Sequence, residues 1–442
     1  MLGLIALFAV SVSILYGVGW FALLLYGLMG SDRDGYAFLQ YLSEGGEYYK
    51  FLMRGLFLLI YGYCSLYYIK VQNTLGGNLK VSIIACQILS CYILLSSFLK
   101  GYGPLEALSF LVYSGVPVFV CWVVYSAQKK LTKGFLAFVF IQMLLAILVL
   151  AFPGLEFLDG GKYKSLEGIY VLPRDGINLE IPGVSTRKGD VGAYAQFHNP
   201  NALGFYSAVS IACGVALLLG GGSAFRYMSG LVFVILGSMA WLNALTRGPI
   251  LLIVLAVGVL LLFYPVDKYR FGLHLKSLFL LFMVALLVLA LVQFEVFSYL
   301  VPDSSSVSVS ARFIGYERGV QAISTYPLWG VGVGWDWGEQ GYPHFISLAF
   351  AAEFGIFAGV LISLMVFGGG TIVVVELLKK ISDGRGDFGA LARGVLLVFV
   401  VWGAALTNNI VSPILFWICL AEASLLAFPP QLRRQIKYKK ND

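Results

Sequence analysis

The chain is poor in charge. Asp, Glu, Lys and Arg make up only 12% of its 442 residues, whereas hydrophobic residues make up 59%. Because an ordinary soluble domain carries about 25% charged residues, a soluble globular fold is excluded. Cysteine is also scarce, and all six cysteines lie in apolar runs, where a thiol behaves as a small hydrophobic group. Neither a disulfide framework nor a zinc site is therefore predicted.

The chain contains long apolar runs of a kind that soluble folds do not have. Most are about 18 to 25 residues long, the length that a helix needs to cross about 30 Å of hydrocarbon. We therefore predict an all-α polytopic membrane protein with about twelve transmembrane helices. The predicted helices cover residues 2–29, 51–69, 81–99, 107–126, 135–153, 202–220, 228–245, 249–264, 277–296, 345–370, 394–408 and 411–428.

The positive charge is concentrated in short segments between the predicted helices. The formal net charge is +7, and basic residues gather near 128, 265 and 376 and in the tail RRQIKYKK. Short basic loops of membrane proteins face the cytoplasm, so both termini are predicted to be cytoplasmic. This distribution favours membrane lipids as the partner of the basic residues and does not favour nucleic acid.

Two loops on the opposite, external side are longer than a simple connection needs, and loops of that size often carry function. The predicted organisation is therefore an N-terminal set of helices 1–5, a first long external loop, helices 6–9, a second long external loop with a catalytic segment, helices 10–12 and a basic cytoplasmic tail. These parts cover residues 1–153, 154–201, 202–296, 297–344, 345–428 and 429–442.

Arginines near the external membrane boundary are the first candidate site residues, because ionisable groups at membrane depth are costly to keep. Arg247 lies between two predicted helices in NALTRGPILL, and Arg187 lies in the first long loop in STRKGD. Arg312 and Arg318 lie in SARFIGYERGVQAI, whose apolar spacing predicts an amphipathic helix along the interface. Snorkelling or headgroup contact explains them structurally. Two-point binding of phosphate oxygens explains them functionally.

Histidine is rare, with three in the chain. His344 follows Pro343 where the second long loop enters an apolar helix, and an imidazole there can accept a proton from a hydroxyl near neutral pH. His198, in FHNPNALG, is the rival, although the Asn-Pro-Asn run explains that segment as a helix cap. Trp335 and Trp337 lie just before His344 and are candidates for stacking on a sugar, or for an interfacial aromatic belt.

Four passages, in this order, resemble the bacterial O-antigen polymerase and O-antigen ligase family of lipid-linked glycan transferases, which are GT-C-like. The passages are RKGDVGAYAQFHNPNALG, LTRGPILLIVL, ARFIGYERGVQAISTYPLWGVGVGW and PHFISLAFAAEFGIFAG. One departure is Phe345, which follows the histidine where the family usually has a polar residue. The first 180 residues show no such resemblance.

The resemblance implies a glycosyltransferase of the bacterial cell inner membrane that takes an undecaprenyl-diphosphate-linked glycan and transfers it with inversion at the periplasmic face. It implies no metal and no cofactor. His344 would be catalytic, Arg247, Arg312 and Arg187 would bind the donor pyrophosphate, and Arg318, Trp335, Trp337 and His198 are candidates for binding the acceptor or sugar.

A polymerase, which extends a lipid-linked repeat unit and works with a chain-length regulator (a co-polymerase), is the leading prediction. The alternative is an O-antigen ligase that delivers the same glycan to the lipid A core, followed by a protein-directed oligosaccharyltransferase. A transporter of the lipid-linked oligosaccharide ranks lower, because it predicts an internal repeat and charges at mid-helix depth. We find no repeat, and the ionisable residues are predicted to cluster at one face.

Overall fold

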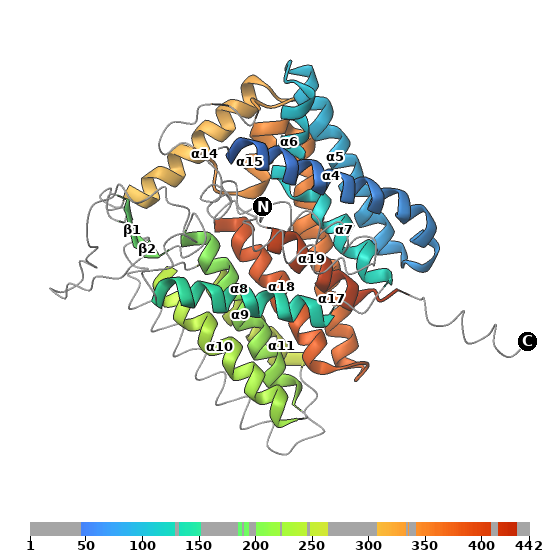
Figure 1. The fold of residues 1–442 in the computed structure, drawn as a ribbon, viewed down its shortest axis with the longest axis vertical. Helices are drawn as coiled ribbons and strands as arrows, with labels where there is room; N and C mark the ends of the chain where they lie inside the picture. The colour runs from blue at the N-terminus through green and yellow to red at the C-terminus, as the bar shows by residue number, and fades with distance from the viewer. Residues whose placement is uncertain are drawn as a thin grey trace, which may run out of the picture.

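The computed structural model describes residues 46–128, 132–151, 184–187, 190–193, 200–221, 223–244, 248–263, 307–332, 335, 342–407 and 414–430. The elements that these residues form are helices apart from one small hairpin (Figure 1). The elements are α4 (Gly46–Val71), η1 (Gln72–Thr74), α5 (Gly77–Leu99), α6 (Pro104–Ser114), α7 (Val116–Gln128), α8 (Thr132–Ala151), β1 (Val184–Arg187), β2 (Asp190–Ala193), α9 (Pro200–Gly220), α10 (Ala224–Ala244), α11 (Gly248–Phe263), α14 (Val307–Thr325), α15 (Ile346–Phe354), α16 (Ile356–Ser363), the π-helix η4 (Leu364–Gly369), α17 (Gly370–Ser382), α18 (Phe388–Thr407) and α19 (Ile414–Ala427).

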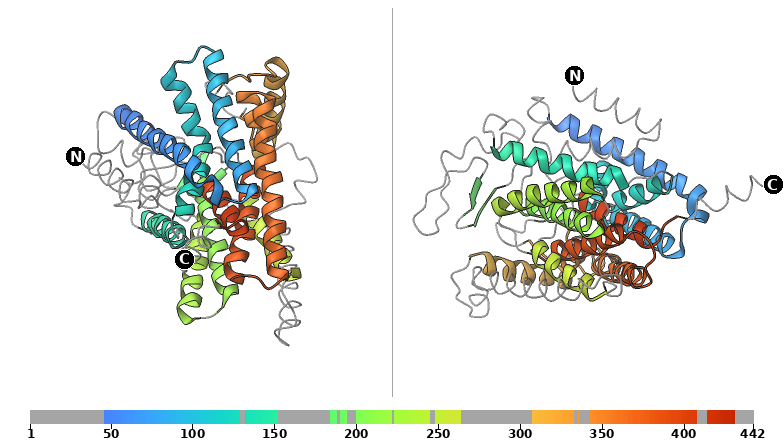
Figure 2. Two further views of the ribbon diagram at one scale, coloured as in Figure 1. Left: turned by 90° about the vertical axis from the view of Figure 1, so that its right-hand side faces the viewer. Right: turned by 90° about the horizontal axis from the view of Figure 1, so that it is seen from below.

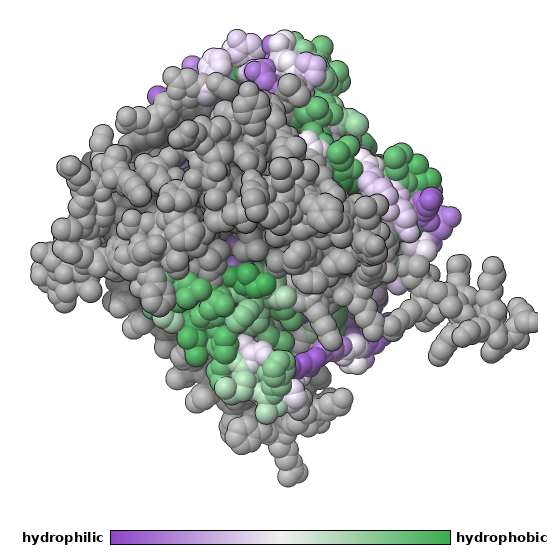
Figure 3. All heavy atoms as spheres, viewed as in Figure 1, coloured by the Kyte–Doolittle hydropathy of each residue, from purple (hydrophilic) through white to green (hydrophobic). Residues whose placement is uncertain are grey.

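Five of the described helical spans are long and apolar enough to cross a membrane: Gly77–Leu99, Ala202–Gly220, Ala224–Leu242, Ile356–Ser382 and Phe388–Leu406. Apolar side chains also cover outer surfaces, as expected for helices that face lipid. On α10 these include Leu231, Ile235, Met239 and Leu242, and Figure 3 shows apolar residues gathered over this part of the molecule. The chain is therefore a helical membrane protein, while the count of twelve helices stays a prediction. The predicted helices 2–29 and 277–296 lie outside the described residues.

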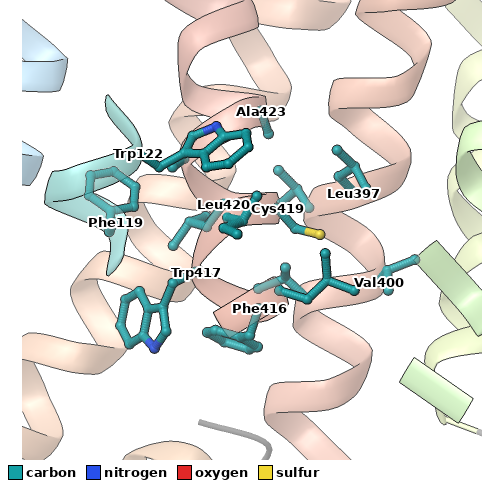
Figure 4. Packing of buried hydrophobic residues seen from close by; sticks show 14 of the residues in the cluster. Phe119, Trp122, Leu397, Val400, Phe416, Trp417, Cys419, Leu420 and Ala423 are labelled. Atoms are coloured by element: carbon teal, nitrogen blue, oxygen red, sulfur yellow. The ribbon is translucent and has the colours of Figure 1, made fainter. Parts of the chain in front are cut away.

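The core is formed where α7, α18 and α19 meet. Among the described residues, Trp122 and Trp417 are the two largest fully buried side chains, and Phe416 lies beside Trp417 with ring centroids 5.4 Å apart. Figure 4 shows Trp417 and Phe416 on α19, with Phe119 of α7 on one side and Val400 of α18 on the other. Burying an aromatic or branched side chain contributes about 1.5–3 kcal/mol. This cluster therefore joins residues far apart in sequence, from the first third of the chain and from its end.

The bundle has two distinct ends, which Figure 2 shows in its left view. At one end the starts of α10 and α18 are joined by an exposed ion pair between Arg226 and Asp387, with nitrogen and oxygen 2.7 Å apart. Gly220 and Gly389 meet nearby so closely that a Cβ on Gly220 would lie 2.9 Å from the Gly389 Cα. The opposite end carries α14, α15 and the end of α5. The candidate site belongs to this second end.

A buried ion pair lies away from the candidate site. Arg393 of α18 and Glu422 of α19 are 3.1 Å apart, with 5% and 4% of their side chains exposed. The Trp122 indole also donates to Glu422 over 3.4 Å. Arg393 is in the second turn of α18, close to the Arg226 and Asp387 end. The expectation that the ionisable residues cluster at one face is therefore wrong. It failed because Arg393 was read as part of the basic segment near 376 and Glu422 as part of an apolar run.

Two predicted helices are broken by glycines in the left-handed region of backbone conformation. The predicted helix 107–126 is two helices, α6 and α7, which meet at Gly115 with a φ of 68°. The predicted helix 345–370 is divided at Gly355, where φ is 102°, and continues through η4 to Ser382. At the first break the indole of Trp417 donates to the Ser114 carbonyl over 3.0 Å. A partner for this carbonyl makes the break tolerable inside the bundle.

The first long loop contains a small element that an all-α prediction leaves out. β1 and β2 pair in antiparallel fashion, and Arg187 lies opposite Asp190. β2 packs against α9 and α10, so the hairpin is docked on the helical bundle.

Candidate functional site

The candidate site is built around α14, which packs tightly on the segment that carries His344. A Cβ on Gly315 would lie 2.5 Å from the Tyr342 carbonyl oxygen, and one on Gly319 would lie 3.0 Å from the Pro343 side chain. These glycines are four residues apart, the spacing that lets helices approach a neighbouring backbone closely. Because Gly315 and Gly319 have no side chains, α14 can lie directly against residues 342 and 343.

The apolar residues of α14 mostly face outward. Phe313 and Val320 expose 68% and 59% of their surfaces, whereas Gly315, Gly319 and Ala322 are buried. The predicted amphipathic helix is therefore present, and its small residues face the protein while its large apolar residues face outward, as a helix at a lipid interface requires.

The candidate arginines of α14 belong to this packed region. Arg312 precedes Gly315 by three residues, so the helical period places its backbone on the same side of α14 as Gly315 and Gly319. Arg318 lies one residue before Gly319 and is exposed. His344 is partly buried and lies just before Phe345, the N-cap residue of α15. The packing therefore brings together the two segments that carry the predicted pyrophosphate-binding arginine and the predicted base.

A glycine-rich turn at residues 327–332 closes the far end of α15. The amides of Val331 and Gly332 donate to the carbonyls of Ala352 and Glu353, over 2.7 and 2.9 Å. The Ile356 amide, at the start of α16, donates to Pro327 over 2.9 Å. These bonds satisfy backbone groups that the break at Gly355 leaves without helical partners. The turn therefore fixes the direction of α15 and of the segment leading into it.

Helix α5 holds the same turn from the other side. Tyr92, Ser96 and Lys100, spaced four residues apart along α5 and at its C-cap, donate to the consecutive carbonyls of Leu328, Trp329 and Gly330. The Ser96 bond is 2.9 Å long. The N-terminal part of the chain thus contacts the candidate site directly.

Lys100 is in an unusual electrostatic environment at the end of α5. Burial lowers the pKa of its ammonium group to about 8, while the negative charge of Glu353 raises it in part. Desolvation disfavours the charged form of a lysine, and a nearby carboxylate favours it. Burial dominates here, so Lys100 loses its proton at a lower pH than an exposed lysine does.

Tyr342 and Glu353 connect the two ends of α15. The Tyr342 hydroxyl donates to Glu353 Oε1 over 2.8 Å, and Glu353 is 5% exposed. The Tyr342 ring packs against Ala322, Val331 and Ala352. The segment before His344 is therefore enclosed between α14 and the end of α15.

Aromatic residues flank this cluster on the exposed side. Tyr326 and Trp335 are about half exposed, at 49% and 48%, and their ring centroids are 6.5 Å apart. Trp329 instead stacks on Tyr92, with centroids 5.6 Å apart. Exposed rings beside a site can stack on a sugar face, so Trp335 keeps its predicted role as a candidate for sugar binding.

The described residues contain the candidate site only in part. Arg247, His198 and Trp337 lie outside them, and the side chains of Arg187 and Arg312 are not described. The ends of α10 and α11 flank Arg247, at the opposite end of α10 from Arg226. The roles assigned to these residues therefore stay predictions.

Metal ligands are not grouped in the described part of the chain, where no three His, Cys, Asp or Glu residues form a cluster that could hold an ion. The prediction of a metal-independent reaction stays untested.

Sequence reasoning missed the residues that hold the candidate site together. Gly315 and Gly319 form a small-xxx-small spacing in GYERG, and Glu353 is a lone acid in the apolar run LAFAAEFG. Both signals are readable, because small residues mark close helix packing and an acid in an apolar helix has a partner. The role of Lys100 has no comparable signal.

A comparison with known protein families finds a match in the region that carries the candidate site. Residues 231–363 match the family model described as O-antigen ligase. The match includes α14, the glycine-rich turn, His344 and the junction of α10 with α11. No curated protein sequence matches the chain. Over residues 231–363, the chain is therefore similar to the O-antigen ligase family.

Proposed function

We propose that the protein is an O-antigen or related polysaccharide polymerase. It transfers a glycan from undecaprenyl diphosphate to a lipid-linked repeat unit at the periplasmic face of the bacterial inner membrane. The observation that carries the proposal is the packing of Gly315 and Gly319 on Tyr342 and Pro343. This packing joins the arginine-bearing helix to the histidine segment inside the family match, residues 231–363.

The proposed reaction is an inverting substitution at the anomeric carbon. An acceptor hydroxyl forms the new carbon–oxygen bond while the bond to the diphosphate oxygen breaks. His344 accepts the proton of the hydroxyl, because an imidazole is half protonated near pH 6.5 and is matched to general-base catalysis near neutral pH. Undecaprenyl diphosphate leaves with the electron pair of the broken bond.

Arginines stabilise the leaving group in this proposal. Negative charge grows on the diphosphate as the bond breaks, and a guanidinium can contact two phosphate oxygens at once. Arg312 is the first candidate, because its helix packs against residues 342 and 343. Arg247 is the second, in the junction between α10 and α11, and Arg187 is the third, in the hairpin that is docked on α9 and α10.

An O-antigen ligase is the second candidate function, because the matching family model is described as O-antigen ligase. Polymerase and ligase share the donor and differ in the acceptor. In the polymerase reaction, a chain-length regulator in the same membrane is the proposed partner.

The experiment that tests the function offers two acceptors to the purified protein. One mixture contains only the lipid-linked repeat unit, and the other also contains lipid A core. Lipid-linked chains of increasing length in the first mixture support the polymerase. Product that forms only in the second mixture supports the ligase instead. Failure of both mixtures to give product refutes the transferase proposal, and movement of unchanged donor across vesicles would then indicate a transporter.

Donor binding tests the arginine roles separately. Replacing Arg312 with alanine removes a charge-assisted contact worth about 1.5–3 kcal/mol, so we expect donor affinity to fall at least about tenfold. Arg226→Ala is the control, because Arg226 pairs with Asp387 at the opposite end of the bundle. Unchanged affinity in Arg312→Ala would refute this assignment.

A further inference from the structure

Glu353 is held at two points beside the glycine-rich turn. Its carboxylate accepts the Tyr342 hydroxyl over 2.8 Å, and its backbone carbonyl accepts the Gly332 amide over 2.9 Å. Lys100 supplies positive charge from the end of α5 and interacts electrostatically with the carboxylate. A buried carboxylate is costly without such partners. One side chain therefore links the helix that follows His344 to the segment that precedes it.

Tyr342 is joined to His344 by a short and conformationally restricted stretch of backbone. Only Pro343 separates the two residues, and the proline ring fixes its φ. Gly315 of α14 lies against the Tyr342 carbonyl, so α14 holds the backbone of residue 342. Glu353 holds the side chain of the same residue by accepting its hydroxyl. Loss of the hydrogen bond between the Tyr342 hydroxyl and Glu353 would therefore weaken the contact that holds the Tyr342 side chain.

We propose that Glu353 is a positioning residue that, through Tyr342, fixes the imidazole of His344 against the acceptor hydroxyl. This inference rests on the proposed function, in which His344 is the base. It adds a residue that does not contact substrate and a path by which α5, outside the family match, supports the chemistry. A base displaced by about 1 Å loses on the order of 100-fold in rate.

The chemistry of the bond separates positioning from direct catalysis. A glutamine at 353 keeps an oxygen that accepts the Tyr342 hydroxyl but cannot take up a proton. Glu353→Gln therefore keeps most of the activity if Glu353 positions Tyr342, and loses it if Glu353 is itself the base. Glu353→Ala and Tyr342→Phe remove the bond from either end.

The test measures kcat and KM for the lipid-linked repeat unit with the full-length protein in detergent. We expect Tyr342→Phe and Glu353→Ala each to lower kcat about 10- to 100-fold with KM within about twofold. Glu353→Gln should keep at least about a third of kcat. The double variant Tyr342→Phe with Glu353→Ala should be no slower than the slower single variant, because both remove one interaction.

The matched control is Tyr125→Phe, which removes a buried hydroxyl of α7 that has no hydrogen-bond partner among the described residues. It should keep wild-type kcat. Wild-type kcat in Tyr342→Phe, or Glu353→Gln as slow as Glu353→Ala, overturns the positioning role. If Glu353→Ala does not fold, Tyr342→Phe and Glu353→Gln decide the outcome alone. Full activity in His344→Ala refutes the role of His344 as the base, on which this inference rests, whereas an inactive His344→Ala with a fully active Tyr342→Phe refutes only the positioning. No product from the wild-type protein refutes the proposed function itself.

Discussion

Placing one methyl group on Gly315 should separate α14 from the histidine segment. In Gly315→Ala the new Cβ would lie 2.5 Å from the Tyr342 carbonyl oxygen, whereas close carbon–oxygen contacts lie at about 3.3–3.6 Å. The helix or the segment must therefore move by roughly 1 Å, because the obstructing atom belongs to the backbone. A shift of that size should lower kcat on the order of 100-fold.

The loss of stability in this variant should be small enough for the protein to stay folded. Alanine gains about 0.5–1 kcal/mol over glycine inside a helix, while forcing a methyl group into a packed contact costs about 1–3 kcal/mol. The net loss is thus at most about 2.5 kcal/mol. The assay is the initial rate of chain lengthening, together with thermal unfolding in detergent. Gly258→Ala is the control, since its Cβ would meet nothing within 4 Å. Wild-type kcat in Gly315→Ala would refute the packing argument.

Three further outcomes test the surrounding structure by thermal unfolding. Gly355→Ala should destabilise the protein by about 1–3 kcal/mol or more, because residue 355 has a φ of 102° and its Cβ would overlap the Leu328 carbonyl; wild-type stability would contradict this. Glu422→Leu should cost about 3–5 kcal/mol by leaving Arg393 buried and unpaired, and adding Arg393→Met should restore most of it; a double variant no more stable than the single one would contradict the pairing. Raising the pH from about 8 toward 10.5 should increase the free energy of unfolding of the wild-type protein relative to that of Lys100→Met. The reason is that the folded state releases the Lys100 proton at a lower pH than the unfolded state does. Identical pH dependence in the two proteins would exclude this effect.

Hydropathy was sufficient to predict most of the described helices but not their interruptions. Runs of apolar residues located α5, α9, α10, α11 and α19 to within a few residues. Gly115 and Gly355 read as ordinary members of apolar runs. The break at Gly115 is accompanied by a contact with Trp417, which is remote in sequence. The break at Gly355 is accompanied by contacts with the turn at 327–332, which lies outside the apolar run. A helix break fixed by tertiary partners is therefore invisible to periodicity.

The sequence was sufficient to predict candidate site residues, but not the residues that hold them in place. The rarity of histidine and the position of Pro343 pointed to His344, and the spacing of apolar residues predicted α14. The contact of Tyr92 with Leu328 joins residues 236 positions apart, a distance over which local patterns carry no information. Glu353 was passed over because an acid in an apolar helix reveals that it has a partner without revealing which one.

The most direct test of the central claim separates donor binding from chemistry in one variant. In His344→Ala, the affinity for the lipid-linked donor should stay within about twofold of wild type, while the single-turnover rate of glycan transfer should fall by about 100- to 10,000-fold, the usual contribution of a general base. A full transfer rate in this variant would contradict the account, because residues 342–344 would then pack against α14 without taking part in the reaction.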